Sequence, residues 1–155
     1  MSFLNFKASD KFVDMVTISK NRLHALVTAS WMNRVMIAIV YMWFGSLKIF
    51  GVSPAEGLVT KLFDITLSPF MSIQQFLILL GLAECLIGLL WLFPRITKMA
   101  FWVMMGHLFT TFLPVLFLPN ETWQSFFALT LTGQYIIKNV VLLSAAWFIY
   151  VFSEE

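Results

Sequence analysis

An apolar run from Met71 to Phe93 carries one charged side chain, Glu84, near its centre. About 20 apolar residues suffice for a helix to cross a bilayer, so this run is long enough to span one. A charge at that depth costs about 2.5 kcal/mol or more and needs a partner or water. The helical stripe that carries Glu84 also holds small residues, which let a second helix approach closely: Gly81, Cys85 and Gly88. We therefore expect Glu84 to face the interior of a helix bundle.

The composition indicates an integral membrane protein. Of 155 residues, 60% are hydrophobic and only 12% are charged, and the mean hydropathy is +0.87. A soluble domain is normally about one quarter charged. A net charge of +2 gives no reason to expect a nucleic acid partner, and the single cysteine excludes an internal disulfide and a CxxC redox pair.

The apolar runs predict an all-α integral membrane fold, a bundle of four transmembrane helices. The predicted spans are 34–52, 72–93, 99–118 and 135–152. Residues 1–33 alternate apolar and charged side chains, which predicts an amphipathic helix on the membrane surface. The predicted organisation is thus a surface segment, 1–33, followed by a transmembrane domain, 34–155.

A short external helix is expected between the first two spans. Pro54 suits the first position of a helix with Ser53 as its cap, and residues 53–69 are too polar to span. We expect this helix to lie over the mouth of the bundle as a lid. Glu56 is then either a solvated charge or a group that faces a cavity beneath the lid.

Candidate partners of Glu84 lie in the other apolar runs. Tyr41, Gly45 and Lys48 share one helical face, and Lys48 either snorkels to the interface or points inward to Glu84 or an anionic ligand. Counted from the helix ends, Lys48 and Glu84 differ in depth by about 12 Å, which argues against direct contact.

The third and fourth spans add further polar groups. His107 shares a helical stripe with Thr110, Thr111 and Pro114. This polar stripe either makes contacts with a neighbouring helix or takes part in a proton relay with Glu84. The histidine favours the relay, because imidazole exchanges protons near neutral pH. Lys138 is either interior or interfacial. The candidate ligand-binding residues are Lys48, Tyr41, Gln134, Tyr135, Lys138 and Glu56.

The basic residues predict the topology. Most lie before the first span or between the second and third: Lys7, Lys11, Lys20, Arg22, Arg34, Arg95 and Lys98. The positive-inside rule then places both termini of this multi-pass protein in the cytoplasm.

Several of these stretches resemble the DoxX-like superfamily, nearest its RclC-type branch of small inner-membrane proteins linked to reactive-chlorine resistance. The resemblance rests on residues 43–50, 55–58 and 68–70, on Gly81-x-x-Glu84 with Gly88, and on 133–139. The family typically has arginine where this chain has Gln134. The resemblance implies a four-helix bundle in the inner (cytoplasmic) membrane.

Three functions follow as alternatives. The first is a membrane subunit with a redox or oxidative-stress function that binds a quinone or a small apolar or anionic ligand, with Glu84 and His107 as proton carriers. The second is a non-catalytic accessory or assembly subunit, and the third a small-molecule transporter. The sequence has no flavin or dinucleotide motif and no convincing haem or metal ligand set. The expected partners are the lipid bilayer and either further copies of the chain or a larger membrane complex.

Overall fold

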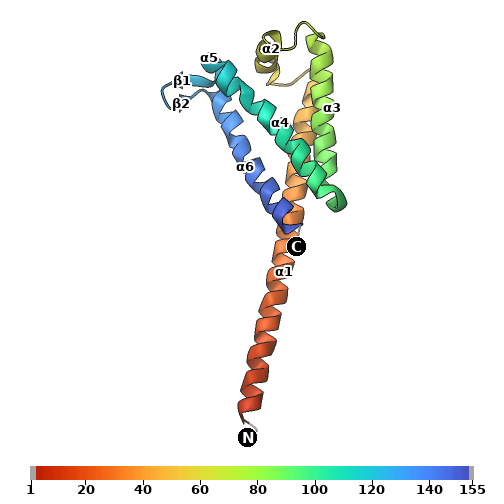
Figure 1. Ribbon diagram of the computed structural model, residues 1–155, viewed down its shortest axis with the longest axis vertical. Coiled ribbons are helices and arrows are strands. Elements are labelled where there is room, and N and C mark those ends of the chain that lie inside the picture. Colours follow the sequence, from red (N-terminus) through yellow and green to blue (C-terminus); the bar gives the residue numbers. More distant parts are fainter. Residues whose placement is uncertain (1–2, 154–155) are drawn as a thin grey trace. The chain divides into compact units, whose positions relative to one another are not determined.

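The computed structural model describes residues 3–153, and their side chains from Ser19 onward. Its elements are α1 (Phe3–Ile49), α2 (Glu56–Asp64), α3 (Ile73–Trp91), the 3₁₀ helix η1 (Pro94–Ile96), α4 (Thr97–Phe117), α5 (Pro119–Thr122), β1 (Trp123–Ser125), β2 (Ala128–Leu129) and α6 (Leu131–Phe152), shown in Figure 1.

Four helical segments in the described chain are long and apolar enough to cross a membrane: Ser19–Ile49, Ile73–Trp91, Pro94–Phe117 and Leu131–Phe152. The predicted helical membrane protein with four spans is confirmed at this level, and the four segments indicate a multi-pass protein. We call the end where α1 ends and α3 begins the α2 end, and the opposite end, which carries η1, the η1 end.

The helix boundaries differ from the predicted ones for local reasons. The first span stops at Ile49 rather than residue 52, because Gly51 adopts a φ of +67°. The Val52 N–H then donates to the Leu47 carbonyl, which is the usual helix stop at a glycine. The fourth span begins at Leu131 rather than 135, because the Thr130 hydroxyl accepts from the Gly133 N–H and caps the helix.

The chain divides into two compact units between Met32 and Asn33. In the first unit, residues 3–32 are helical, and the prediction that 1–33 lies on the membrane surface stays a prediction. Most of the predicted apolar face, including Phe3, Phe6 and Phe12, lies among residues whose side chains are outside the described part. The bundle belongs entirely to the second unit.

Within the second unit, α1 and α3 are in backbone contact. A Cβ on Gly81 would lie 2.6 Å from the carbonyl oxygen of Gly45, and one on Gly88 would lie 2.9 Å from that of Ala38. Contacts advance along α3 as they retreat along α1, so the two helices are antiparallel. The small residues on the Glu84 stripe thus permit the close approach that their spacing predicts.

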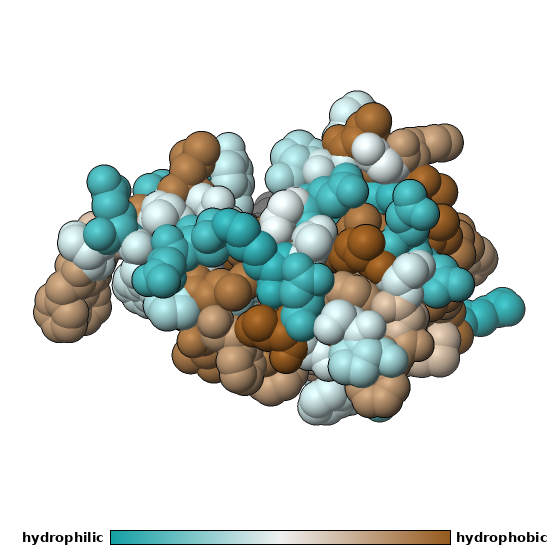
Figure 2. Space-filling model, turned by 90° about the horizontal axis from the view of Figure 1, so that it is seen from above, coloured by the Kyte–Doolittle hydropathy of each residue, from teal (hydrophilic) through white to brown (hydrophobic). Residues whose placement is uncertain are grey.

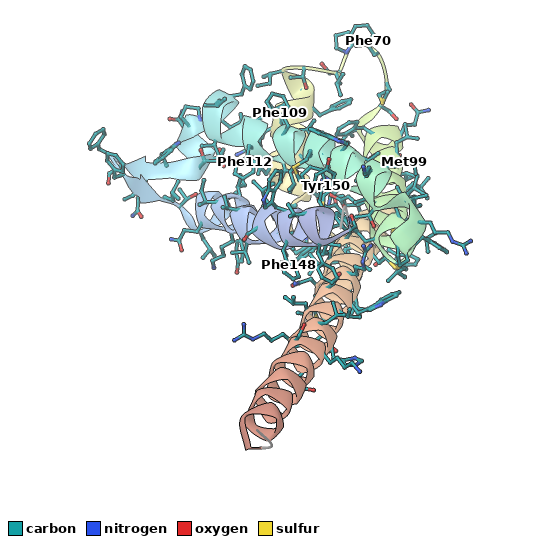
Figure 3. All side chains as sticks on the ribbon, turned by 60° about the horizontal axis from the view of Figure 1, so that its bottom comes forward. Phe70, Met99, Phe109, Phe112, Phe148 and Tyr150 are labelled. Atoms are coloured by element: carbon teal, nitrogen blue, oxygen red, sulfur yellow. The ribbon has the colours of Figure 1, made fainter. Side chains whose placement is uncertain are left out.

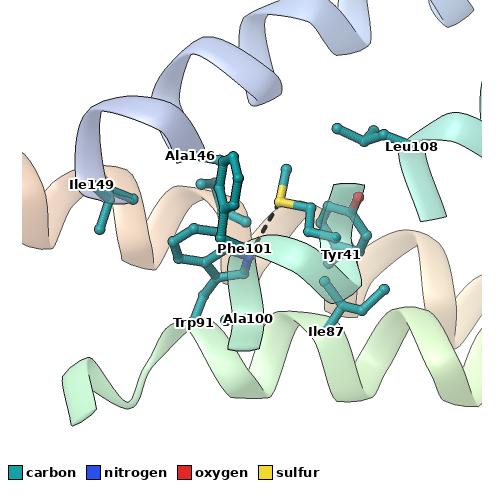
Figure 4. Packing of buried hydrophobic residues seen from close by; sticks show 10 residues of the cluster. Tyr41, Ile87, Trp91, Ala100, Phe101, Leu108, Ala146 and Ile149 are labelled. Atoms are coloured by element: carbon teal, nitrogen blue, oxygen red, sulfur yellow. Dashed lines mark hydrogen bonds between the residues drawn. The ribbon is translucent and has the colours of Figure 1, made fainter. Parts of the chain in front are cut away.

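The hydrophobic core lies toward the η1 end, where α1, α3, α4 and α6 meet (Figure 4). Trp91 and Met104 are fully buried, and the Trp91 indole N–H donates to the Met104 sulfur at 3.2 Å. The Phe101 ring stacks on Tyr150 of α6 with 4.5 Å between ring centroids. This packing holds the four helices together below the polar residues described next.

The α2 end carries the connecting elements. Seen from this end, hydrophilic residues form a band with hydrophobic residues on both sides (Figure 2). Phe70 lies at the outermost part of the loop between α2 and α3 (Figure 3). Residues 119–129 form α5 and a short antiparallel hairpin of β1 and β2, neither of which is predicted from the sequence.

Candidate functional site

Four side chains from three spanning helices form a hydrogen-bonded series, which we call the polar chain: Lys48, Glu84, His107 and Tyr41. The Lys48 ammonium donates to Glu84 Oε2 at 2.6 Å. The other carboxylate oxygen of Glu84 lies 3.2 Å from His107 Nε2. His107 Nδ1 lies 3.2 Å from the Tyr41 hydroxyl. The chain therefore runs from α1 through α3 to α4 and back to α1.

Lys48 and Glu84 meet because their side chains lean toward each other. Gly45 lies opposite Gly81, which places Lys48 and Glu84 about 9 Å apart along the bundle at 1.5 Å per residue. Every helical Cβ tilts toward the N-terminus of its own helix. In antiparallel helices, Lys48 therefore leans toward the η1 end and Glu84 toward the α2 end. The expectation that Lys48 and Glu84 do not touch is therefore wrong, because counting residues from the helix ends leaves out the lean of the two side chains.

His107 connects the ion pair to Tyr41. A carboxylate only accepts hydrogen bonds, so the tautomer of a neutral imidazole that satisfies both contacts has its hydrogen on Nε2, facing Glu84, and accepts from the Tyr41 hydroxyl at Nδ1. The Tyr41 and His107 rings also meet edge-on, with centroids 5.3 Å apart. The hydroxyls of Thr110 and Thr111 both donate to the His107 carbonyl in the turn before Pro114. The predicted stripe on α4 therefore supports His107 through its backbone.

The polar chain is shielded from the surroundings. The Lys48 and Glu84 side chains are 7% and 9% exposed, and His107 is 14% exposed. Among the described residues, every fully buried side-chain nitrogen or oxygen has a hydrogen-bond partner. The opposite charges of Lys48 and Glu84 compensate each other, and His107 is the most accessible of these three groups. The arrangement can therefore hold a proton at several adjacent positions without an isolated buried charge.

The remaining predicted site residues lie elsewhere. Lys138 is exposed on α6, with its ammonium 5.0 Å from the ring centroid of Tyr135 on the same helix. Tyr135 is also exposed, and the Gln134 amide donates to the Leu129 carbonyl. Glu56 is half-buried in the first turn of α2. The structure thus brings Tyr41, Lys48, Glu84 and His107 together and leaves the other four candidates outside this cluster.

Arg34 is a second buried cation, and the sequence alone identifies it only as a topology signal. Its guanidinium donates to the Thr97 hydroxyl at 2.7 Å and to the Trp91 carbonyl at 3.3 Å. It thereby joins α1 to the end of α3 and the start of α4, where positive charge is favoured by the helix dipole of α3. The signal in the sequence that could indicate the burial of Arg34 is its position as the first residue of an apolar run.

Comparison of the chain with protein-family models, with curated proteins and with solved structures finds no match.

Proposed function

We propose that this protein is a DoxX-like membrane subunit with a redox or oxidative-stress function, in which the polar chain moves a proton to or from a quinone or another small ligand. The observation that supports this most is the position of His107. Its two ring nitrogens lie 3.2 Å from Glu84 and 3.2 Å from Tyr41, so the series has no gap at its middle. A structural ion pair alone would not require the imidazole and the phenol.

Each residue has a defined part in this proposal. Lys48 compensates the negative charge of Glu84, and Glu84 receives the hydrogen of His107 Nε2. His107 can take the Tyr41 proton at Nδ1 and release the proton that Nε2 already carries to Glu84, while Tyr41 regains a proton from the ligand. The Tyr41 hydroxyl and the Lys48 ammonium are the donor types that would hold a quinone oxygen. A quinone bound here would be the acceptor of electrons and protons.

The lid belongs to the same proposal. Lys61 of α2 forms an ion pair with Glu121 of α5, so α2 is tied to the connection between α4 and α6. We infer that α2 covers the end of the bundle nearest Lys48, as its position between α1 and α3 suggests. The basic residues favour an orientation with both termini in the cytoplasm, and the resemblance implies an inner-membrane location.

A non-catalytic accessory or assembly subunit is the second candidate. It is favoured by the complete pairing of the buried polar groups in the described chain, because such groups also fix one packing of helices in a membrane. In that case the buried charges would fix the packing of the helices, and the packed helices would present a surface to further copies of the chain or to a larger membrane complex.

The presence of a quinone in the purified protein distinguishes the redox subunit from the accessory subunit. The protein is purified in mild detergent, and its lipid extract is analysed for quinones by mass spectrometry. The redox proposal expects a quinone that is retained by the wild type and by a control, Arg95→Lys, at an exposed position in η1. The quinone should be depleted in His107→Gln, with thermal unfolding of each variant measured in parallel. A quinone-free protein that co-purifies with a larger complex would support the accessory role instead.

A further inference from the structure

The hairpin at the α2 end exposes two large apolar side chains at its tip. Phe126 and Phe127 connect β1 to β2 and are 93% and 84% exposed. Phe127 has a φ of +59°, a left-handed conformation that bulky residues adopt rarely. The backbone therefore holds both rings outward, although small polar residues would suit such a turn better.

The hairpin is attached firmly to the spanning helices. The Thr130 N–H donates to the Thr122 carbonyl at 3.0 Å, and its hydroxyl donates to the Glu121 carbonyl at 2.6 Å. The Trp123 indole donates to the Val115 carbonyl of α4 at 3.2 Å. These bonds connect the hairpin to the last turn of α4 and the first turn of α6. Its tip is thus held at a fixed depth relative to both helices.

The surroundings of the tip match lipid rather than water. The sequence has no Asp, Glu, Lys or Arg between Glu121 and Lys138. The apolar surface continues from the hairpin onto the two spanning helices through exposed side chains on their adjoining ends: Leu116, Phe117 and Leu131. In Figure 1 the hairpin projects sideways from the ends of α4 and α6. A sideways projection at this level meets the boundary between headgroups and acyl chains, where aromatic rings are favoured.

We propose that the tip formed by Phe126 and Phe127 inserts into the lipid boundary at the α2 end and anchors the connection between α4 and α6 in the bilayer. The partner is the membrane lipid, because the tip has no charge with which to select a headgroup and is continuous with the lipid-facing surface of the helices. The anchor does not depend on the proposed redox function, since it uses none of the residues of the polar chain.

Photocrosslinking tests this directly. The photoreactive analogue p-benzoylphenylalanine replaces Phe126 in the full chain, which is reconstituted into lipid nanodiscs, irradiated and analysed for adducts by mass spectrometry. The same analogue at Val141, an exposed position inside α6, serves as the lipid-facing reference, and at Asp64, an exposed position on α2, as the reference outside the span.

The expected result is a yield of lipid adducts at position 126 within about twofold of that at position 141 and at least about fivefold above that at position 64. A probe at Ser125, in the neighbouring β1, provides a second reading if the analogue at 126 disturbs the turn. Adducts formed mainly with protein would mean that the tip contacts another chain and would overturn the proposal. So would a yield no higher than at Asp64, which would place the tip in water.

Discussion

Gly45 and Gly81 face each other so closely that a Cβ on Gly45 would lie 2.6 Å from the Gly81 carbonyl oxygen. The obstacle is backbone, so neither helix can yield by a change of rotamer. This contact sets the register of α1 against α3 and, with it, the meeting of Lys48 and Glu84 one turn away on either side. Two glycines thus determine the geometry of the polar chain without being part of it.

The substitution Gly81→Ala should force α1 and α3 apart. We expect a loss of about 1–3 kcal/mol in stability, the usual result of overpacking, together with a weakened Lys48–Glu84 contact. Thermal unfolding in detergent measures the loss. Gly106→Ala is the matched control, because a Cβ on Gly106 meets nothing within 4 Å in the described structure. The control should be neutral or stabilising, since alanine favours helix over glycine. Equal behaviour of the two variants would show that α1 and α3 are not in backbone contact.

The sequence predicts the four spans well because length and apolar composition are enough to identify them. It also identifies Glu84, Lys48, His107 and Tyr41, since each is a polar or ionisable group inside or next to an apolar run. Their roles in catalysis or ligand binding stay predictions. The direct contact of Lys48 with Glu84 could not be settled from the sequence, because it depends on which residue of α1 lies opposite Gly81.

Two other features escape prediction from sequence for different reasons. The β1–β2 hairpin is too short to show a periodic pattern, and its turn places Phe127 in a conformation that the local sequence does not favour. Arg34 looks like an interfacial charge until Thr97 and the Trp91 carbonyl are seen beside it. Both depend on contacts between residues far apart in the chain.

Removal of Lys48 tests the buried ion pair. Lys48→Met leaves the Glu84 carboxylate without its cation, and we expect a loss of about 3–5 kcal/mol in stability. Lys48→Met combined with Glu84→Gln has no buried charge in the pair and should regain most of that loss. The two thermal unfolding curves measure the difference. If the double variant were as unstable as the single one, the ammonium would be stabilising something other than Glu84.

The same double variant separates structure from function. A purely structural pair should be replaceable, so the accessory role predicts that the double variant keeps the wild-type phenotype and partners. The redox proposal predicts loss of quinone-linked activity despite restored stability, because the amide introduced at position 84 cannot take up a proton as a carboxylate does. Activity and unfolding are therefore measured on the same preparation.

Tyr41→Phe removes only the hydroxyl at the end of the polar chain. The ring contact with His107 remains, so the expected loss of stability is about 1 kcal/mol, the size of one hydrogen bond. The redox proposal expects a slower proton-linked step and a larger solvent isotope effect on turnover. Tyr150→Phe, whose ring stacks on Phe101 in the core, is the control and should leave the isotope effect unchanged. An unaltered rate in Tyr41→Phe would remove Tyr41 from the relay.

Arg34→Lys tests the connection at the η1 end. Lysine keeps the charge but lacks the planar fork that reaches the Thr97 hydroxyl and the Trp91 carbonyl together. We expect a loss of about 1.5–3 kcal/mol, the range for a hydrogen bond from a charged group. Arg95→Lys, at an exposed position in η1, should change stability by less than about 0.5 kcal/mol. A similar effect at both positions would mean that Arg34 acts through its charge alone.

Lys138 and Glu84 should act independently. Lys138 contacts Tyr135 on α6, whereas Glu84 contacts Lys48 and His107, so the two residues have different partners. Effects of residues without shared partners add within about 0.3–0.5 kcal/mol. We therefore expect the stability of Lys138→Met with Glu84→Gln to equal the sum of the single changes, with Lys138→Met alone nearly neutral because its ammonium already reaches outward along the Tyr135 ring. A coupling energy well above that limit would place Lys138 in the site with Glu84, as one interpretation of the sequence has it, and would require α6 to move toward α3.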